Sequence, residues 1–135
     1  MLVDLEIVTP ERLLMSRPID MVVIPAAEGE MGVLFGHSPM IVLLRGGEIR
    51  LYENSQVVER LFVSGGFAEV TPQRVTVLAN DATPVAELSR TDGQRRLAAA
   101  EAEYAGADKT DMSALDAAMD HLQSARAQLE LGGAA

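Results

Sequence analysis

The sequence predicts a β-plus-α protein, in which an all-β sandwich or barrel over residues 1–84 precedes an antiparallel two-helix hairpin over residues 87–132. Three observations support this division. Up to Pro84, short apolar runs recur about every eight to twelve residues, and Gly, Pro, Asn or Ser lie between them. This pattern is typical of β-sandwiches and β-barrels. From Glu87 onward alanine dominates and proline is absent, which favours helix. Apolar residues there also recur at helical spacings.

The first part of the chain contains two clear strands and one ambiguous segment. Residues 3–8 (VDLEIV) alternate between apolar and polar side chains, which is the period of a half-buried strand. Residues 11–17 fit either a short strand or a turn, and we expect Pro18 to end that segment. Residues 19–24 (IDMVVI) form a compact β-branched run that predicts a buried strand, with Pro25 as its boundary.

Further along, the pattern predicts one strand and two hairpins. Residues 40–44 form an apolar run that Gly46-Gly47 closes. Residues 48–52 and 56–63 predict a hairpin around the turn residues between them, and residues 67–70 and 75–79 predict a second hairpin. Pro72 lies in the turn of the second hairpin, where it is tolerated. The candidate core positions of the 56–63 strand are Val57, Leu61 and Val63.

The first predicted helix covers residues 92–104, and a break at residues 106–108 follows it. Gly93 weakens its first turn, because glycine is a poor helix former. The apolar stripe of this helix consists of Leu97, Ala100 and Tyr104. Because the break is short, we expect the two helices to pack antiparallel.

The second predicted helix has the stronger pattern. Ser113 and Asp116 have capping-box spacing at its start, and Gly132-Gly133 is expected to end it. Ala118 and Ala125 offer small side chains for close approach. The apolar stripe, interrupted by one arginine, consists of Met112, Leu115, Met119, Leu122, Arg126 and Leu129. Neither helix is long enough to be stable alone, so the hairpin must pack on itself or on another surface.

Composition excludes several classes of function. The chain has 135 residues, the length of about one domain, and no cysteine, which removes disulfides and thiolate sites and fits a reducing compartment. A net charge of -9 opposes binding to nucleic acid or anionic lipid. We expect no membrane insertion, because no apolar run reaches the roughly 20 residues that span a bilayer, and the N-terminus lacks a signal pattern. A protein partner with basic or apolar surface is expected.

The most distinctive stretch is residues 28–39, EGEMGVLFGHSP. It combines one carboxylate, Glu30, and one imidazole, His37, with apolar neighbours, which suits a contact surface better than a catalytic pocket. The plainer alternatives are a solvated turn and a loop histidine that bonds the local backbone. The glycines that predict a shaped series of bends are Gly29, Gly32 and Gly36.

No pattern of catalytic or ligating residues occurs in the chain. The sequence has two histidines and none of the common zinc, redox, nucleophile-elbow or phosphate-loop motifs, so we expect no catalytic site, metal or cofactor. Gly65-Gly66 indicates a bulge or tight bend between strands. His121 is expected on a solvated face. Arg126 is expected to be an edge residue whose stem covers apolar surface, with an ion-pairing contact as the alternative.

Two stretches together resemble a known family. EGEMGVLFGHSPMI (residues 28–41) and VSGGFAEVTPQRVTVLA (residues 63–79) resemble the two signatures of the epsilon subunit family of F-type, proton-translocating ATP synthases. The alanine-rich tail continues the likeness at the level of architecture. The resemblance implies a ten-stranded β-sandwich followed by a two-helix hairpin.

The resemblance also implies a function without catalysis. Members of this family sit in the rotating central stalk, bind the gamma subunit through the sandwich and rest on the membrane ring of c subunits, which couples proton flow to ATP synthesis. The complex would lie at the cytoplasmic face of an energy-transducing membrane. The loop that faces the polar loops of the c ring would contain Glu30, Met31, Gly32, Gly36, His37 and Pro39.

The chain departs from the family pattern at three places. Phe35 stands where proline is common, which adds apolar surface and removes a backbone constraint. Of the positions that bind ATP in some members, here residues 88–93, only the aliphatic Leu88 is kept, so we expect no nucleotide site. The tail of many members contacts the alpha and beta catalytic subunits through basic residues. Here Arg126 is the single base on the second helix, against four acids: Asp111, Asp116, Asp120 and Glu130.

Three functions are therefore weighed. A structural coupling subunit is the leading hypothesis, and a brake on ATP hydrolysis through the hairpin is the second. A free-standing β-sandwich that binds a small ligand is the third, and it has the least support because the chain offers few aromatic side chains.

Overall fold

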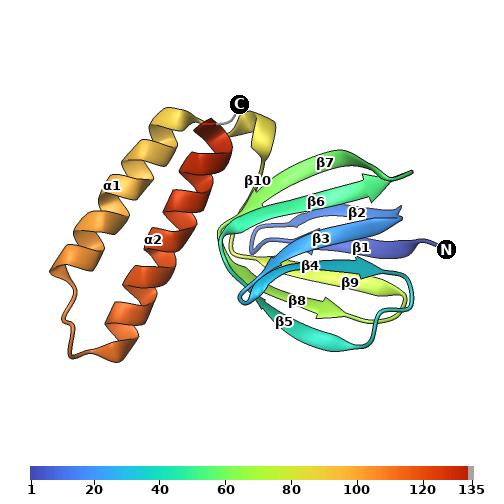
Figure 1. Ribbon diagram of the computed structural model, residues 1–135, viewed down its shortest axis with the longest axis horizontal. Coiled ribbons are helices and arrows are strands. Elements are labelled where there is room, and N and C mark those ends of the chain that lie inside the picture. The colour runs from blue at the N-terminus through green and yellow to red at the C-terminus, as the bar shows by residue number, and fades with distance from the viewer. Residues whose placement is uncertain (134–135) are drawn as a thin grey trace.

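The computed structural model describes residues 1–133 and consists of a ten-stranded β-sandwich followed by two α-helices (Figure 1). The predicted β-plus-α fold class is confirmed. The strands are β1 (Val3–Val8), β2 (Leu13–Ile19), β3 (Met21–Ala26), β4 (Gly29–Leu34), β5 (Met40–Leu44), β6 (Gly47–Glu53), β7 (Gln56–Val63), β8 (Gly66–Val70), β9 (Arg74–Ala79) and β10 (Ala82–Pro84). A short 3-10 helix (Val85–Glu87) then leads into α1 (Arg90–Gly106) and α2 (Met112–Gly133).

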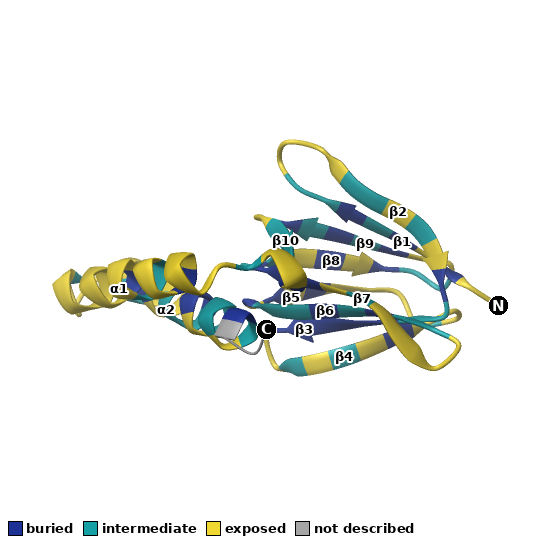
Figure 2. Ribbon diagram, turned by 90° about the horizontal axis from the view of Figure 1, so that it is seen from above, coloured by how far each residue is buried: buried dark blue, intermediate teal, exposed yellow. Residues whose placement is uncertain are grey.

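The strands form two facing layers (Figure 2). Hydrogen-bonded neighbours follow the order β10-β7-β6-β3-β5-β8-β9-β1-β2, and β4 pairs with β3 alone. One layer contains β3, β4, β6 and β7, the other contains β1, β2, β5, β8 and β9, and the two meet where Ala26 lies opposite Leu44. All paired strands are antiparallel except β1 and β9, which run parallel with Asp4 opposite Arg74.

The core between the layers is aliphatic. The alternation in β1 is confirmed, because its three inward side chains are fully buried and the intervening acids are not. The β6–β7 hairpin turns at Asn54 and Ser55, whose φ angles of 53° and 65° belong to the left-handed region used by two-residue turns. The largest fully buried side chains are Leu5, Ile7, Ile19, Ile24, Ile49, Leu51 and Leu61.

Two prolines do not end strands as the sequence predicted. Pro18 lies within β2, which pairs only with β1, so its missing N–H falls on a strand at the edge of the layer. Pro25 lies within β3, beyond Met21–Val23, the only residues of β3 that pair with β6. Both prolines therefore occupy positions where a strand can do without one donor.

The glycine-rich stretch is half strand. Residues 29–34 form β4 and pair with the whole of β3, so the expected series of bends is wrong over this part. Gly29 and Gly36 have positive φ angles of 137° and 89°, whereas Gly32 does not. The strand forms because Val33 is fully buried, and ladder bonding to β3 outweighs the low strand propensity of glycine.

The core prediction for β7 is right for Leu61 and Val63 and wrong for Val57, which is 41% exposed. The pairing of β6 with β7 shifts register between Leu51 and Tyr52, so β7 has one residue more than β6 at this point. Such a bulge reverses the facing of the residues on its far side, so Val57 points outward.

The helical hairpin packs through small residues. Ala100, Ala118 and Ala125 are buried, and a Cβ on Gly93 would lie only 3.2 Å from the Cα of Leu129. Ala118 and Ala125, the small residues predicted to allow close approach, are both fully buried. Of the large residues in the predicted stripes, Leu129 packs against Gly93, whereas Tyr104, Met112 and Met119 are exposed.

The ends of α2 also differ from the prediction. The Asp111 carboxylate accepts a hydrogen bond from the N–H of Ala114 at 3.2 Å, so Asp111 caps the helix and Ser113 lies inside it. At the other end, α2 includes Gly132 and Gly133. Gly132 is buried, and a Cβ there would lie 3.3 Å from Leu88, so this glycine allows α2 to pack beside the segment that enters α1. Neither described helix is long and apolar enough to cross a bilayer.

We expect Gly66→Ala to lower the free energy of unfolding by about 2–5 kcal/mol. Gly66 has a φ of 130°, and a Cβ there would lie 2.1 Å from the carbonyl oxygen of Leu78, so both strain and overlap oppose alanine. Urea denaturation of the isolated chain measures the change. Gly106→Ala is the control, because nothing lies within 4 Å of its Cβ position in α1. A Gly66→Ala variant within about 0.5 kcal/mol of the parent would contradict the structure.

Candidate functional site

An ion-pair ladder crosses the outer face of the layer that contains β4, β6 and β7. Arg50 Nη1 on β6 donates to Glu30 Oε2 on β4 at 2.6 Å and to Glu48 Oε1 at 3.2 Å. Glu48 Oε2 in turn accepts from Arg60 Nε on β7 at 2.8 Å. These four residues, Glu30, Arg50, Glu48 and Arg60, form an alternating ladder across three strands, with two acids and two bases.

Arg50 is the centre of this ladder. The hydrogen bond that Arg50 donates to Glu30 is the main cause that raises the pKa of Arg50 above its ordinary value, and the bonds that it donates to Tyr52 and Glu48 add to it. Arg50 Nε also donates to the Tyr52 hydroxyl at 3.2 Å. The Glu30 side chain stays 55% exposed, whereas that of Glu48 is 10% exposed. The ladder therefore has a fixed centre and an open acidic end.

The predicted ring-facing residues do not form one loop. Glu30 lies opposite Pro25, at the end of the sandwich where the β3–β4 turn is found, close to the helices (Figure 1). Gly36, His37 and Pro39 follow the other end of β4, where the Gly36 N–H donates to the Pro72 carbonyl at 2.7 Å. The four residue steps from Glu30 to Leu34 along β4 alone separate the two groups by roughly 13 Å.

His37 bonds the local backbone, which was the plainer of the two alternatives for this residue. Its Nδ1 donates to the carbonyl oxygen of Ser38 at 2.8 Å, and its own N–H donates to the carbonyl of Leu34 at 3.2 Å. Leu34 and Phe35 are exposed beside it. The distal loop, residues 35–39, is therefore a compact turn with apolar surface.

The outer face of the other layer carries an apolar row that crosses all five strands. Leu43 lies opposite Phe67, Phe67 lies opposite Leu78, and Val8 lies between Leu78 and Leu13. Cross-strand partners point to the same face, so these five side chains form one continuous row. Leu43, Phe67 and Leu13 are 67%, 47% and 57% exposed, which is unusual for a contiguous set of large apolar side chains.

The hairpin is attached to the sandwich at a polar joint. The N–H of Gly46, between β5 and β6, donates to Gln123 Oε1 at 2.9 Å, and Gln123 Nε2 donates back to the Gly46 carbonyl at 2.7 Å. A Cβ on Gly46 would lie 2.5 Å from the Cα of Ser124, so only glycine fits this approach. The joint consequently depends on two reciprocal hydrogen bonds and one missing methyl group.

Arg96 extends the joint into α1. Its guanidinium donates to Ser124 Oγ at 2.9 Å and to Gln128 Oε1 at 2.7 Å, and it lies 5.8 Å from the centre of the Phe62 ring on β7. One side chain thus connects both helices and the sandwich. Burial of Ser124, which is 1% exposed, is possible because Arg96 satisfies its hydroxyl.

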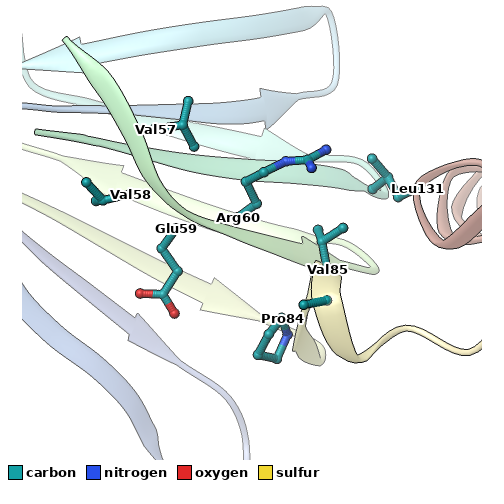
Figure 3. A pocket seen from close by; sticks show the side chains of 8 residues that line it. Val57, Val58, Glu59, Arg60, Pro84, Val85 and Leu131 are labelled. Atoms are coloured by element: carbon teal, nitrogen blue, oxygen red, sulfur yellow. The ribbon is translucent and has the colours of Figure 1, made fainter. Parts of the chain in front are cut away.

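A pocket lies beside β7 and the end of α2 (Figure 3). Its charged side chains are engaged elsewhere, since Glu59 pairs with Arg17 and Arg60 pairs with Glu48. The pocket therefore lacks the convergent polar groups of a ligand site. Its lining residues are Val57, Val58, Glu59, Arg60, Pro84, Val85, Ala86 and Leu131.

The two remaining candidates lie on the hairpin. Arg126 is exposed and makes no ion pair with any of residues 1–133; it lines a shallow groove with Tyr104 and Met119, which fits an edge residue. His121 is exposed as predicted, and its Nδ1 lies 2.9 Å from the Glu103 carboxylate on α1.

Comparison with known proteins gives these surfaces a context. Residues 2–85 match the family described as the ATP synthase delta/epsilon chain, β-sandwich domain. The ATP synthase epsilon chain of Granulibacter bethesdensis is 67% identical over 94% of this chain and 94% of that protein. The chain belongs to the ATP synthase epsilon chain family. The epsilon chain of Gluconacetobacter diazotrophicus is 45% identical over 97% of this chain and 93% of its own length.

Solved structures share the fold of both parts. A chain of the Euglena gracilis mitochondrial ATP synthase, from a structure of OSCP, F1 and c-ring in rotational state 1, superposes with a TM-score of 0.74 at 22% identity, covering 93% of this chain and 78% of that one. A chain from the central stalk and c-ring of the Tetrahymena thermophila mitochondrial enzyme gives 0.67 at 13% identity, covering 96% of both.

The positions aligned with the family's nucleotide motif serve to start α1. The Ser89 hydroxyl accepts from the N–H of Asp92 at 3.2 Å, which makes Ser89 the N-cap, and Gly93 packs against Leu129. Ser89 and Gly93 therefore have structural roles in capping and packing α1. The expectation of no nucleotide site stays a prediction.

Several residues of these surfaces escaped the sequence analysis. Nothing near Arg50 in the chain marks it as the partner of Glu30, because the pair forms only when β6 and β4 flank β3. Leu43 and Phe67 belong to strands that were predicted, and their alternation with Val42 and Ala68 could have marked them as outward apolar residues. Gly46 looked like a strand boundary, and no local signal pairs it with Gln123.

We expect Gly46→Ala and Gln123→Ala to loosen the hairpin from the sandwich. The first introduces an overlap with the backbone of Ser124 and the second removes two hydrogen bonds, at a cost of about 1–3 kcal/mol each. Hydrogen exchange of α2 amides should accelerate while that of the sandwich core is unchanged. Gln94→Ala, on the exposed side of α1, is the control. Equal protection of α2 in Gly46→Ala and the parent would disprove the joint.

Proposed function

We propose that this chain is a non-catalytic rotor subunit in the central stalk of an ATP synthase, where it helps to couple proton flow through the membrane ring to ATP synthesis. The proposal is supported mainly by the two outer faces of the sandwich in this member of the family. One face has the apolar row, and the other has the ion-pair ladder. A coupling subunit needs contact surfaces on a stiff body and no reactive group. Its place would be at the periphery of the membrane, on the cytoplasmic side.

The apolar row is the proposed docking surface for the gamma subunit. Exposed contiguous apolar side chains of this kind mark protein interfaces more often than free surface. Leu43 and Phe67 lie opposite each other at the β5 end of the row, and both are exposed. They would be its anchors, since a few large side chains that become buried at an interface contribute most of the binding free energy. The row lies wholly on the sandwich, so gamma binding would not require the hairpin.

The acidic end of the sandwich is the proposed contact with the c ring. Glu30, Met31 and Gly32 belong to β4 beside the β3–β4 turn, with Glu28 exposed in the turn itself. Carboxylates there suit the polar loops of a c ring better than the apolar distal loop does. The loop with Gly36, His37 and Pro39 follows the other end of β4, so it would face away from the ring (Figure 1).

A brake on ATP hydrolysis is the second candidate, and the polar joint favours it. The hairpin is held by a few hydrogen bonds, and Tyr104, Met112 and Met119 stay exposed on it. A segment held in this way could leave the sandwich and use those side chains on another partner, with Arg126 toward the alpha and beta subunits. The acids of α2 weigh against such a contact with acidic surfaces.

We expect the double substitution Leu43→Ser and Phe67→Ser to abolish co-purification of the tagged chain with a co-expressed gamma subunit, because it removes the two anchors of the row. Residues 1–86 alone should retain gamma. Val57→Ser with Val58→Ser is the matched control, since both valines are exposed on β7 in the other layer. Full retention of gamma by the Leu43 and Phe67 variant would place the interface elsewhere.

Deletion of residues 87–135 tests the second candidate. If coupling is the chain's whole task, the assembled enzyme should hydrolyse ATP at an unchanged rate, because the hairpin then touches no catalytic subunit. Steady-state hydrolysis by the purified complex measures this, with gamma retention as the assembly control. A clear rise in rate would assign the brake function to the hairpin.

A further inference from the structure

Glu30 is well placed for a contact, but its side chain is not fixed by its own strand. It lies on β4, which has a partner on one side only, and more than half of the side chain is exposed. A free glutamate in this position samples several rotamers, and binding would have to order it. The feature that orders it in the structure comes from a different strand, β6.

Arg50 on β6 holds one oxygen of Glu30 and is itself immobilised. Its Nη1 bonds Glu30 Oε2 at 2.6 Å, and the same guanidinium contacts the Tyr52 hydroxyl and the nearly buried Glu48. A planar guanidinium with several fixed contacts keeps its orientation better than an ammonium would. Because Arg50 does not move freely, the Glu30 carboxylate has a defined direction before any partner arrives.

The second oxygen of Glu30, Oε1, makes no hydrogen bond within residues 1–133. Arg50 offsets the charge of Glu30, and the open oxygen keeps its capacity to accept. Such a group suits N–H or O–H donors of an uncharged polar loop, because a cationic partner would have to compete with Arg50.

We propose that Arg50 is a positioning residue, which orients the Glu30 carboxylate so that its free oxygen accepts hydrogen bonds from the polar loops of the c ring. This rests on the proposed contact between the acidic end and the ring. A purely structural role fits less well, since pairs as exposed as Arg50–Glu30 contribute little to folding stability. Arg60 offers the comparison, because it pairs with the same Glu48 but does not touch Glu30.

The test is a double-mutant cycle on binding of the full-length chain, assembled with gamma, to purified c ring in detergent. We expect Glu30→Gln and Arg50→Gln each to weaken binding by about tenfold, and the double variant to be no weaker than either single one. Arg60→Gln removes the same charge from the same ladder and should bind as the parent does. Thermal unfolding of each variant should be unchanged.

Each other outcome is decisive. If Glu30→Gln weakens binding and Arg50→Gln does not, the positioning role is wrong while the ring contact stands. Equal weakening by Arg50→Gln and Arg60→Gln would reveal a general charge effect and overturn the role as well. If Glu30→Gln binds normally, the acidic end does not contact the ring, and both proposals fall together. Additive effects of Glu30→Gln and Arg50→Gln would show that the two residues act independently.

Discussion

The surfaces of this protein depend on the pairing register of its strands. Side chains alternate between the two sides of a strand, so the positions that bury Val42, Ala68 and Val77 also direct Leu43, Phe67 and Leu78 outward. A slip by one residue would exchange the two sets, burying the apolar row and exposing the core. The aliphatic core and the proposed gamma surface are therefore two results of one pairing pattern.

Local alternation is sufficient to predict most strands and the change from sheet to helix, because those features are properties of neighbouring residues. Local alternation is insufficient where pairing with a neighbouring strand determines whether a segment forms a strand. The stretch around Gly32 has poor strand propensity and becomes β4 only because β3 offers a ladder, and Pro18 and Pro25 are tolerated because of which neighbours they lack. The predicted site was divided for the same reason, since an extended strand separates Glu30 from His37.

In the helical hairpin, small residues are buried where the sequence pattern pointed to large ones. The apolar stripe of α2 is a good sign of a helix, but the apolar residues that the hairpin buries are mainly alanines, and Gly93 allows close packing against Leu129. Large side chains such as Met119 then remain on the flanks and stay available to other partners. Its attachment to the sandwich through Gly46 and Gln123 joins residues 77 positions apart, which no local pattern could predict.

The parallel pairing of β1 with β9 determines when the sandwich can be completed during synthesis. β1 leaves the ribosome well before its partner strand β9, because Arg74 follows Asp4, the residue that it pairs with, by 70 residues. β2 pairs with β1 alone, so this first hairpin has no place in the sheet until β9 exists. Long-range pairing of this kind slows folding, because the loop must close before any contact stabilises it. The nascent chain must therefore keep its first apolar strands out of wrong pairings until most of the sandwich has been made.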